Sequence, residues 1–201
     1  MNYLAHIYLS GDDRRVQIGN FVGDAVKGSG YRQYPLEFQR GILLHREIDA
    51  FSDIHPLVKE AVVMGKQVFG RYSGVVTDIL FDHFLAVDFK AYAAVSLRRF
   101  AWKFYVALLL NYRYLPGRFQ GFLWHFILTD RLRRYASPAG IRQSLEIMAV
   151  YRGLQVDPVL AIGFLESNYR ELQNLFRAFF PELQMMCRQK LINDCYDNKD
   201  K

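Results

Sequence analysis

Cysteine is nearly absent from this sequence, and so are the patterns of a secreted chain. Of 201 residues only Cys187 and Cys195 are cysteines, and their positions do not form a zinc-binding pattern. Two cysteines near one end of the chain provide no disulfide framework, which favours a reducing compartment. The opening residues MNYLAHIYLS lack the basic segment and apolar run of a secretory signal. We therefore predict a soluble cytoplasmic protein.

Long apolar runs and the common nucleotide-binding motifs are also missing. The most apolar stretch, residues 100–110, contains Lys103 and is shorter than the roughly 20 residues that a membrane-spanning helix needs. The chain has no phosphate-binding loop, no dinucleotide-binding glycine motif and no serine nucleophile elbow. The segment GSG at 28–30 is typical of a helix stop. These absences argue against a membrane-spanning protein and against the commonest ATP-, NAD- and serine-dependent enzymes.

Aromatic and basic residues, by contrast, are abundant. Hydrophobic residues make up 51% of the chain, with 16 phenylalanines and 13 tyrosines, which excludes disorder for most of it and is enough for a real core. The formal charge of +6 indicates an anionic partner: nucleic acid, a membrane surface or an acidic protein. Composition alone does not choose among these three.

Apolar residues recur with the 3.6-residue period of helices along nearly the whole chain. Prolines stand where several helices begin, because proline costs no hydrogen bond in the first turn. We predict one all-α domain, a helical bundle over residues 1–195, with a frayed tail over 196–201. The predicted helices cover residues 15–27, 36–51, 56–69, 72–87, 92–110, 118–135, 138–151 and 158–179, and a last helix follows Pro181.

Ionisable side chains interrupt the apolar faces of four segments in the first half of the chain. Burying an unpaired carboxylate costs several kcal/mol or more, so such a group is normally paired, hydrogen-bonded or bound to a metal. The clearest case is VVTDILFDHFLAVDF, residues 75–89, which carries Asp78, Asp82 and His83. The other three segments contribute His6, Asp24 and the group His45, Arg46, Asp49 and Asp53.

Spacing places several of these groups on shared helix faces. His45 and Asp49 are four residues apart, and so are Asp78 and Asp82. Two carboxylates on one apolar face repel each other, so we expect a cation between Asp78 and Asp82, with His83 able to lean toward the same face. Two facing helices can then present a mixed cluster of imidazole and carboxylate groups in the core of a bundle.

Each of these residues also has an explanation that needs no metal. His6 can be a hydrogen-bonded core histidine, and His45 with Asp49 can form an ordinary pair along one helix face. Asp53, just before a histidine-proline pair, can be a turn or capping residue. Taken together, three histidines and four or five aspartates on several helices favour a metal site over these separate explanations.

The types of side chain indicate which metal such a site prefers. Nitrogen and oxygen donors without cysteine thiolate argue against structural zinc and suit Mn²⁺, Mg²⁺ or Fe²⁺. A metal of this kind polarises a phosphoryl oxygen and activates water near neutral pH. The residues therefore predict metal-assisted hydrolysis of a phosphate ester.

Four motifs, in this order, resemble the acyl carrier protein phosphodiesterase family: NYLAHIYLS, IGNFVGDAVKG, GILLHREIDAFSD and TDILFDHFLA. FLW at 122–124 and FRAFFPEL at 176–183 also match, so the resemblance covers nearly the whole chain. It implies Mn²⁺-dependent hydrolysis of the phosphodiester that joins 4′-phosphopantetheine to a serine of holo acyl carrier protein. It also implies an all-α fold distantly similar to HD phosphohydrolases, although Asp82 before His83 reverses the His-Asp order of that wider group.

The resemblance also implies roles for individual residues. The implied metal ligands are His6, Asp24, His45, Asp78, Asp82 and His83, and the implied catalytic residues are Asp24, His45, Arg46 and Asp49. Lys27 and Arg46 lie within the motifs and are expected to hold the phosphate, since an arginine can bind it with two parallel hydrogen bonds. Acyl carrier proteins are acidic, so a carrier, rather than nucleic acid or a membrane, is the expected partner of the basic residues. The expected docking residues are Arg98, Arg99 and Lys103 in one segment, and Arg131 and Arg134 in another.

Two other functions stay open at this stage. A phosphohydrolase that acts on a nucleotide or another small phosphodiester would use the same ligands. A non-enzymatic helical domain that binds nucleic acid would explain the basic charge, but it would leave the buried aspartates unexplained. The number of metal ions and the oligomeric state do not follow from the sequence.

Overall fold

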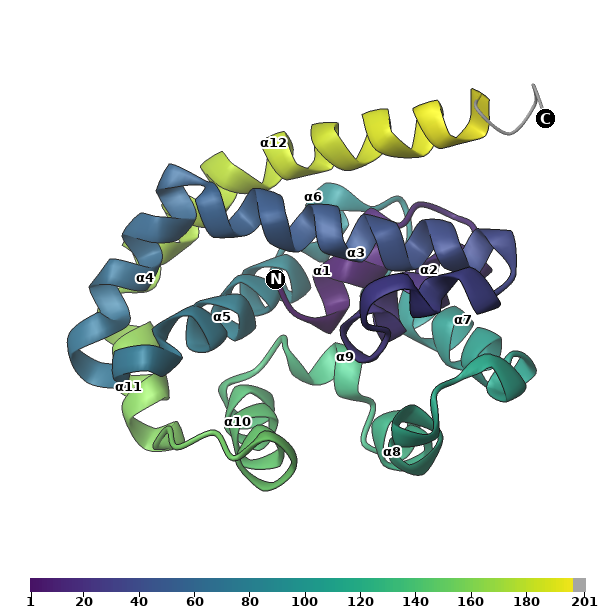
Figure 1. Cartoon of the computed structure of the whole chain (residues 1–201). Helices are drawn as coiled ribbons and strands as arrows, with labels where there is room; N and C mark the ends of the chain where they lie inside the picture. The colour runs from purple at the N-terminus through teal and green to yellow at the C-terminus, as the bar shows by residue number, and fades with distance from the viewer. Residues whose placement is uncertain (197–201) are drawn as a thin grey trace.

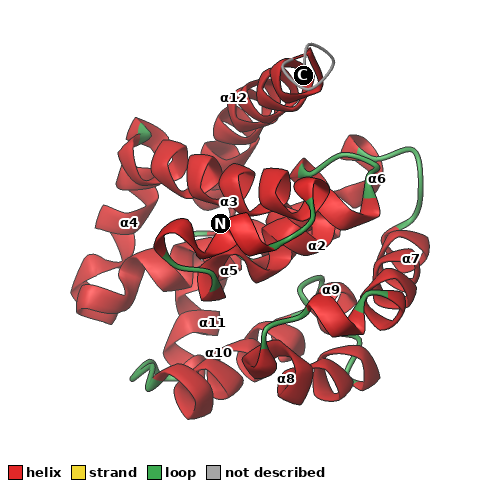
Figure 2. Cartoon of the chain, turned by 45° about the vertical axis from the view of Figure 1, so that its right-hand side comes forward, coloured by secondary structure: helices red, strands yellow, loops and turns green. Residues whose placement is uncertain are grey.

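The computed structural model describes residues 1–196, apart from the side chains at 151–152 and 195–196, and this part of the chain contains helices and loops but no strand (Figure 2). The all-α prediction is confirmed, whereas the likeness to HD phosphohydrolases stays a prediction. The frayed tail predicted beyond Tyr196 lies outside the described residues. The α-helices are α1 (Tyr3–Leu9), α2 (Arg14–Val22), α3 (Leu36–Ile54), α4 (Pro56–Phe69), α5 (Ser73–Val87), α6 (Phe89–Tyr92), α7 (Leu97–Leu110), α8 (Gly117–Leu128), α9 (Arg131–Arg134), α10 (Pro138–Arg152), α11 (Pro158–Ser167) and α12 (Tyr169–Tyr196). The 3₁₀ turns are η1 (Gly23–Ala25), η2 (Gly28–Gln33), η3 (Gly70–Tyr72) and η4 (Tyr112–Tyr114).

Short polar side chains determine where several helices begin. Asp13, Ser96, Ser137 and Asp157 accept hydrogen bonds from backbone N–H groups in the first turns of α2, α7, α10 and α11. Proline is the first residue of α4, α10 and α11, as the sequence predicts. The predicted helix over 15–27 is shorter, because α2 ends at Val22 and the 3₁₀ turn η1 follows.

Other predicted helices also have different boundaries in the structure, and the helix predicted over 92–110 begins only at Leu97. Residues 118–135 form α8 and α9 rather than one helix, because Asp130 adopts a left-handed backbone with φ of 47° that interrupts a right-handed helix. The helix that begins at Pro158 ends at Ser167, and α12 then continues through Pro181 instead of stopping there. A proline inside a helix costs about 3 kcal/mol or more. Burial of the phenylalanine and leucine side chains on both sides of Pro181 offsets this cost.

Helix α1 lies at the centre of the molecule, beside α2 and α5 (Figure 1). Helix α12 runs along α3 and α4 on one side, and α8, α9 and α10 gather on the other side of α1 and α5. Leu4, Ala5 and Ile7 of α1 are fully buried, and one continuous hydrophobic core extends from Met1 to Cys187. Among the described residues, no helix is both long enough and apolar enough to cross a membrane.

Helices α2 and α3 pack more closely than side chains ordinarily allow. A Cβ atom on Gly19 would lie 2.2 Å from the carbonyl oxygen of Phe38, and one on Gly41 would lie 2.1 Å from the carbonyl oxygen of Val16. The Gly41 Cβ would also lie 2.6 Å from the backbone nitrogen of Asn20. Both positions therefore require glycine, and their contact sets Asn20 of α2 at a defined place against α3.

Candidate metal centre

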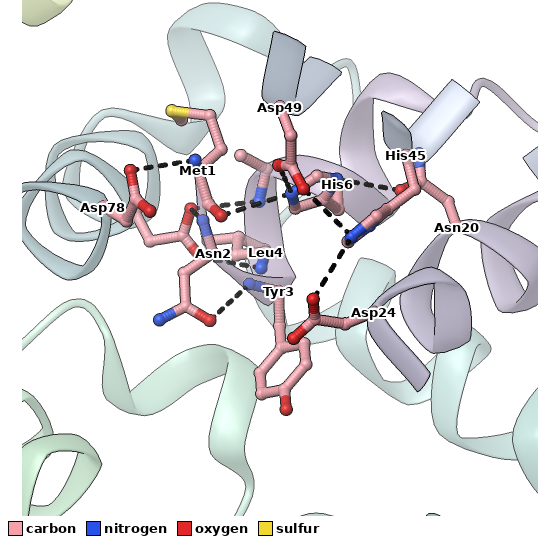
Figure 3. A network of polar contacts seen from close by, with 12 residues as sticks. Met1, Asn2, Tyr3, Leu4, His6, Asn20, Asp24, His45, Asp49 and Asp78 are labelled. Atoms are coloured by element: carbon pink, nitrogen blue, oxygen red, sulfur yellow. Dashed lines mark hydrogen bonds and ion pairs between the residues drawn. The ribbon is translucent and has the colours of Figure 1, made fainter. Parts of the chain in front are cut away.

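Two imidazole rings and one carboxylate meet between α1 and α3, and we call His6, His45 and Asp49 the cluster (Figure 3). His6 Nε2 lies 3.2 Å from Asp49 Oδ1, and His45 Nε2 lies 3.2 Å from Asp49 Oδ2. The two rings stack with their centroids 4.2 Å apart. One ligand atom from each of the three residues lies within 4.8 Å of the others, which is an arrangement that can share one cation.

The backbone around the cluster leaves room for these rings. His45 and Asp49 are one turn apart on α3 and share a face, as their spacing predicts. A Cβ atom on Gly23 would lie 2.4 Å from His45 Cγ, so glycine at this position admits the imidazole against η1. Both histidines are buried and Asp49 is half-buried, so the cluster lies at the inner end of a cavity of about 210 Å³.

Asn20 determines the orientation of the His6 ring. Its amide nitrogen donates to Ser10 Oγ at 2.8 Å, which leaves its carbonyl oxygen to accept from His6 Nδ1–H at 2.8 Å. The other ring nitrogen, Nε2, then carries a lone pair. It faces Asp49 Oδ1 and the backbone carbonyl oxygen of Met1, each 3.2 Å away. Metal-binding histidines are usually oriented through their second nitrogen in this way.

Three potential acceptors converge at His6 Nε2: this ring nitrogen, Asp49 Oδ1 and the carbonyl oxygen of Met1. Burial lowers the pKa of His6 despite its contact with Asp49, so the ring is neutral at pH 7. Burial alone would raise the pKa of Asp49, but contacts with His45 and His6 outweigh it and hold that pKa below its usual range, so the carboxylate is ionised. A neutral ring nitrogen, a carboxylate oxygen and a carbonyl oxygen therefore face one another, and a divalent cation bound among them satisfies all three.

Further carboxylates surround the cluster. Asp24 Oδ1 lies 4.0 Å from His45 Nε2 and 3.9 Å from Lys27 Nζ. Asp53 and Asp78 line the same cavity. Of the predicted site residues, the structure thus brings His6, Asp24, His45 and Asp49 together, with Lys27 and Asp78 nearby.

The three predicted site residues of α5 have partners of their own, and of the three only Asp78 lines the cavity of the cluster. Asp78 Oδ1 lies 2.9 Å from the amine of Met1. Asp82 is fully buried and accepts three backbone N–H hydrogen bonds, of 2.7 to 3.3 Å, at the start of α1. His83 donates through Nδ1 to the carbonyl oxygen of Tyr135 at 2.8 Å. Each carboxylate therefore has a partner within the protein, and the cation expected between Asp78 and Asp82 from their spacing stays a prediction.

Arg46 stabilises a loop next to the site. Its guanidinium donates to the carbonyl oxygens of Val26 and Gly28, at 3.0 and 2.7 Å, and lies over the ring of Tyr31. These contacts hold the segment after η1, and Arg46 does not line the cavity of the cluster. Its contact with a phosphate stays a prediction, as does that of the exposed Lys27.

The predicted docking residues divide between the surface and the interior. Arg98 and Arg99 are exposed on α7 and line a groove of about 620 Å³ together with Trp102, which is 65% exposed. Arg131 is only 2% exposed, so its burial removes it from any surface patch, contrary to expectation. The half-buried members of the predicted set are Lys103 and Arg134.

Two contributors to the cluster were missed in the sequence. Asn20 is fully buried, and a buried amide within an apolar helix must find hydrogen-bond partners, so its position beside the histidine motif was a usable signal. The sequence contains no signal for the carbonyl oxygen of Met1, because every residue carries a backbone carbonyl. Only the fold brings this one to His6.

The protein has a helical fold and a buried histidine–aspartate cluster beside a cavity. These features place it among helical proteins with a candidate metal-dependent hydrolytic centre.

Residues 1–183 match the acyl carrier protein phosphodiesterase family. The acyl carrier protein phosphodiesterase of Yersinia pestis is 32% identical over 194 residues, which cover 96% of this chain and 100% of the relative. That of Photorhabdus laumondii is 31% identical over 196 residues, covering 94% and 96%. The chain belongs to the acyl carrier protein phosphodiesterase family, as its motifs predicted. No solved structure matches it.

Proposed function

We propose that this protein is a metal-dependent phosphodiesterase that releases 4′-phosphopantetheine from holo acyl carrier protein. Family membership supports the reaction and the substrate. The observation that carries the metal dependence is the convergence of His6 Nε2 and His45 Nε2 on the Asp49 carboxylate, each 3.2 Å from one of its oxygens. The proposed reaction takes place in the cytoplasm, where carrier proteins work.

The donor set favours Mn²⁺, with Mg²⁺ or Fe²⁺ as substitutes, because imidazole nitrogen and carboxylate oxygen meet without thiolate. When bound, such a cation polarises the phosphoryl oxygen and activates the attacking water. We assign the cation to His6, His45 and Asp49, with the Asp24 carboxylate beside them on η1. Asn20 holds the His6 ring in the tautomer that presents Nε2.

The hydrolysis adds one water molecule across the phosphodiester. The water oxygen bonds to phosphorus, the bond from phosphorus to the serine Oγ breaks, and Oγ takes up a proton. Asp24 is suited to accept the proton of the water, because its carboxylate is 38% exposed beside His45 and can exchange protons with solvent. Lys27, next to Asp24, places a positive charge near the phosphate. The products are apo carrier protein and 4′-phosphopantetheine.

The test is to incubate the purified protein with holo carrier protein and Mn²⁺ and to measure the mass loss of the carrier. We expect wild type to give apo carrier, and Asp49→Asn or His45→Gln to lose about a hundredfold or more in turnover with helical content retained. Asp12→Asn is the matched control, since Asp12 is exposed and away from the cluster. Wild-type turnover in Asp49→Asn would remove that residue from the site. Cleavage of nucleotides but not of holo carrier would favour the alternative phosphohydrolase.

A further inference from the structure

A second cavity, of about 340 Å³, adjoins the metal centre on the side of α8, α9 and α10. Tyr3 and Met148 line both cavities, so the two share a wall. The ring of Tyr3 points away from His6 and Asp49 (Figure 3). The rest of the lining includes the apolar or aromatic residues Phe119, Phe122 and Ile147 and two arginines, of which Arg118 is exposed and Arg131 is buried.

Arg131 is a buried charged side chain, and two of its three guanidinium nitrogens lack a hydrogen-bond partner among the described residues. It is 2% exposed, and the two nitrogens are Nε and Nη1. The buried Tyr135 hydroxyl next to it is a neutral group that interacts with the Arg131 guanidinium, so it does not neutralise the charge. Leaving charged donors unpaired in an interior costs several kcal/mol. A ligand with carbonyl oxygens that enters this cavity would offset part of that cost.

Gly121 provides an independent observation. It lies inside α8 and lines the second cavity, yet a Cβ atom there would meet no heavy atom within 4 Å. Glycine inside a helix is less stable than alanine. The fold therefore does not require glycine at this position, whereas a side chain there would extend into the open space beside the cavity.

We infer that the second cavity receives the pantetheine arm of the substrate while the phosphodiester lies at the cluster, an inference that rests on the proposed function. The serine end of the phosphodiester belongs to a folded protein, which is too large for a cavity of this volume, so only the slender arm fits. The arm carries geminal methyl groups, methylenes and two amides. Phe119, Phe122 and Met148 suit the methyl groups, and the Arg131 guanidinium donates to an amide carbonyl. A volume of 340 Å³ lies within the range of about 300–1,000 Å³ for small-molecule sites.

A kinetic comparison tests this assignment. We expect Gly121→Leu, and separately Arg131→Gln, to lower kcat/KM for holo carrier about tenfold more than for bis(p-nitrophenyl) phosphate, which has no arm. The matched controls are Gly163→Leu, at an exposed helical glycine whose Cβ would also meet nothing within 4 Å, and Arg142→Gln at an exposed arginine of α10. A buried arginine can be needed for folding. If Arg131→Gln does not fold, the result for Gly121→Leu alone decides the test. Equal losses on the two substrates in Gly121→Leu would overturn the inference.

A binding measurement separates failure of this inference from failure of the proposed function. Pantetheine, which lacks the phosphate, is titrated into wild type and Gly121→Leu in chelator by calorimetry. We expect binding to wild type and at least about tenfold weaker binding to the variant, whether or not the protein cleaves holo carrier. If wild type cleaves holo carrier but pantetheine binds both proteins equally, or neither, the arm lies elsewhere. If pantetheine binds as expected but holo carrier is not cleaved, the cavity stands and the proposed reaction is wrong.

Discussion

Asp82 shows how a single buried carboxylate can serve the fold beside a functional site. Its oxygens accept the backbone N–H groups of Asn2, Leu4 and Ala5, which are the groups that the start of α1 leaves without helical partners. Burial nevertheless raises the pKa of Asp82 to about 7, although these hydrogen bonds and the N-terminal amine act to lower it. The carboxyl therefore binds its proton more tightly in the folded chain than its ordinary pKa of 3.8 implies.

This shift predicts how stability depends on pH. A carboxyl whose pKa is raised on folding contributes stability that is fully present below the unfolded pKa and is lost as the pH rises through the folded pKa. We expect Asp82→Asn to gain stability relative to wild type between pH 5 and pH 7, at up to about 1.4 kcal/mol per pH unit. Urea unfolding of both proteins in chelator at several pH values gives the difference, and a difference independent of pH would contradict the raised pKa.

At the scale of helices, the contact of α2 with α3 supports the site. Gly19 and Gly41 allow the two backbones to approach, and this contact places Asn20 where it orients His6. We predict that Gly41→Ala destabilises the protein by about 1–3 kcal/mol or more, because the new Cβ would meet backbone atoms of α2 that cannot move aside. Thermal unfolding measures the loss.

Gly163→Ala is the matched control for that experiment. Gly163 is exposed in α11 and a Cβ there meets nothing within 4 Å, so alanine should be neutral or stabilising by up to about 1 kcal/mol. If Gly41→Ala proved as harmless as the control, α2 and α3 would not be in the close contact described.

Two basic grooves compete as the docking surface for an acidic carrier. The predicted groove on α7 holds Arg98 and Arg99. A groove of about 660 Å³ on α4 and η3 holds Lys59, Lys66 and Arg71, and it shares Asp53, Val75 and Asp78 with the cavity of the cluster. If the proposed reaction takes place at the cluster, the carrier serine must reach it, and the second groove is the one that adjoins the cavity of the cluster.

Charge reversal distinguishes the grooves. Arg98→Glu with Arg99→Glu, or Lys59→Glu with Lys66→Glu, should lower kcat/KM for holo carrier by about tenfold at low salt if that groove binds the carrier. The loss should fade as salt rises, because exposed charges are screened. Arg170→Glu with Arg188→Glu on α12 changes the net charge equally and serves as control. An equal loss in all three pairs would mean that only net charge matters.

At the scale of the whole molecule, a cation bound at the cluster should link α1 to α3 and so stabilise the folded chain. A ligand bound only by the native state stabilises it by mass action, by about 2.7 kcal/mol at a hundred times its Kd. We therefore expect Mn²⁺ to raise the Tm by roughly 5–10 °C over chelator for a chain of this size. Differential scanning fluorimetry with and without chelator measures the shift.

Two variants test whether this rise in Tm originates at the cluster. Asp49→Asn should lose most of the Tm response to Mn²⁺, because it removes a ligand of the cluster. Asp82→Asn should keep the response, because Asp82 is engaged by backbone groups of α1. The reverse pattern would return the cation to α5, and a Tm indifferent to Mn²⁺ in every protein would count against the metal centre.

The amino-acid sequence by itself determined the all-α class, most helix starts and the donor types of the site. Helical periodicity and prolines act locally, so they can be read without knowing what a segment packs against. The i,i+4 pair His45 and Asp49 follows from the same local geometry. The linked motifs also identified the family, because they combine residue type with order along the chain.

Only the tertiary structure decided which of the polar residues meet. Helical spacing puts Asp78 and Asp82 on one face, but it does not say that the amine of Met1 and the start of α1 would lie against that face. The same limit applies to Arg131, whose place in a basic segment suggested the surface, and to Pro181, where burial of distant side chains outweighs a local preference. Contacts between residues far apart in sequence depend on how the whole core packs, and no local pattern contains that information.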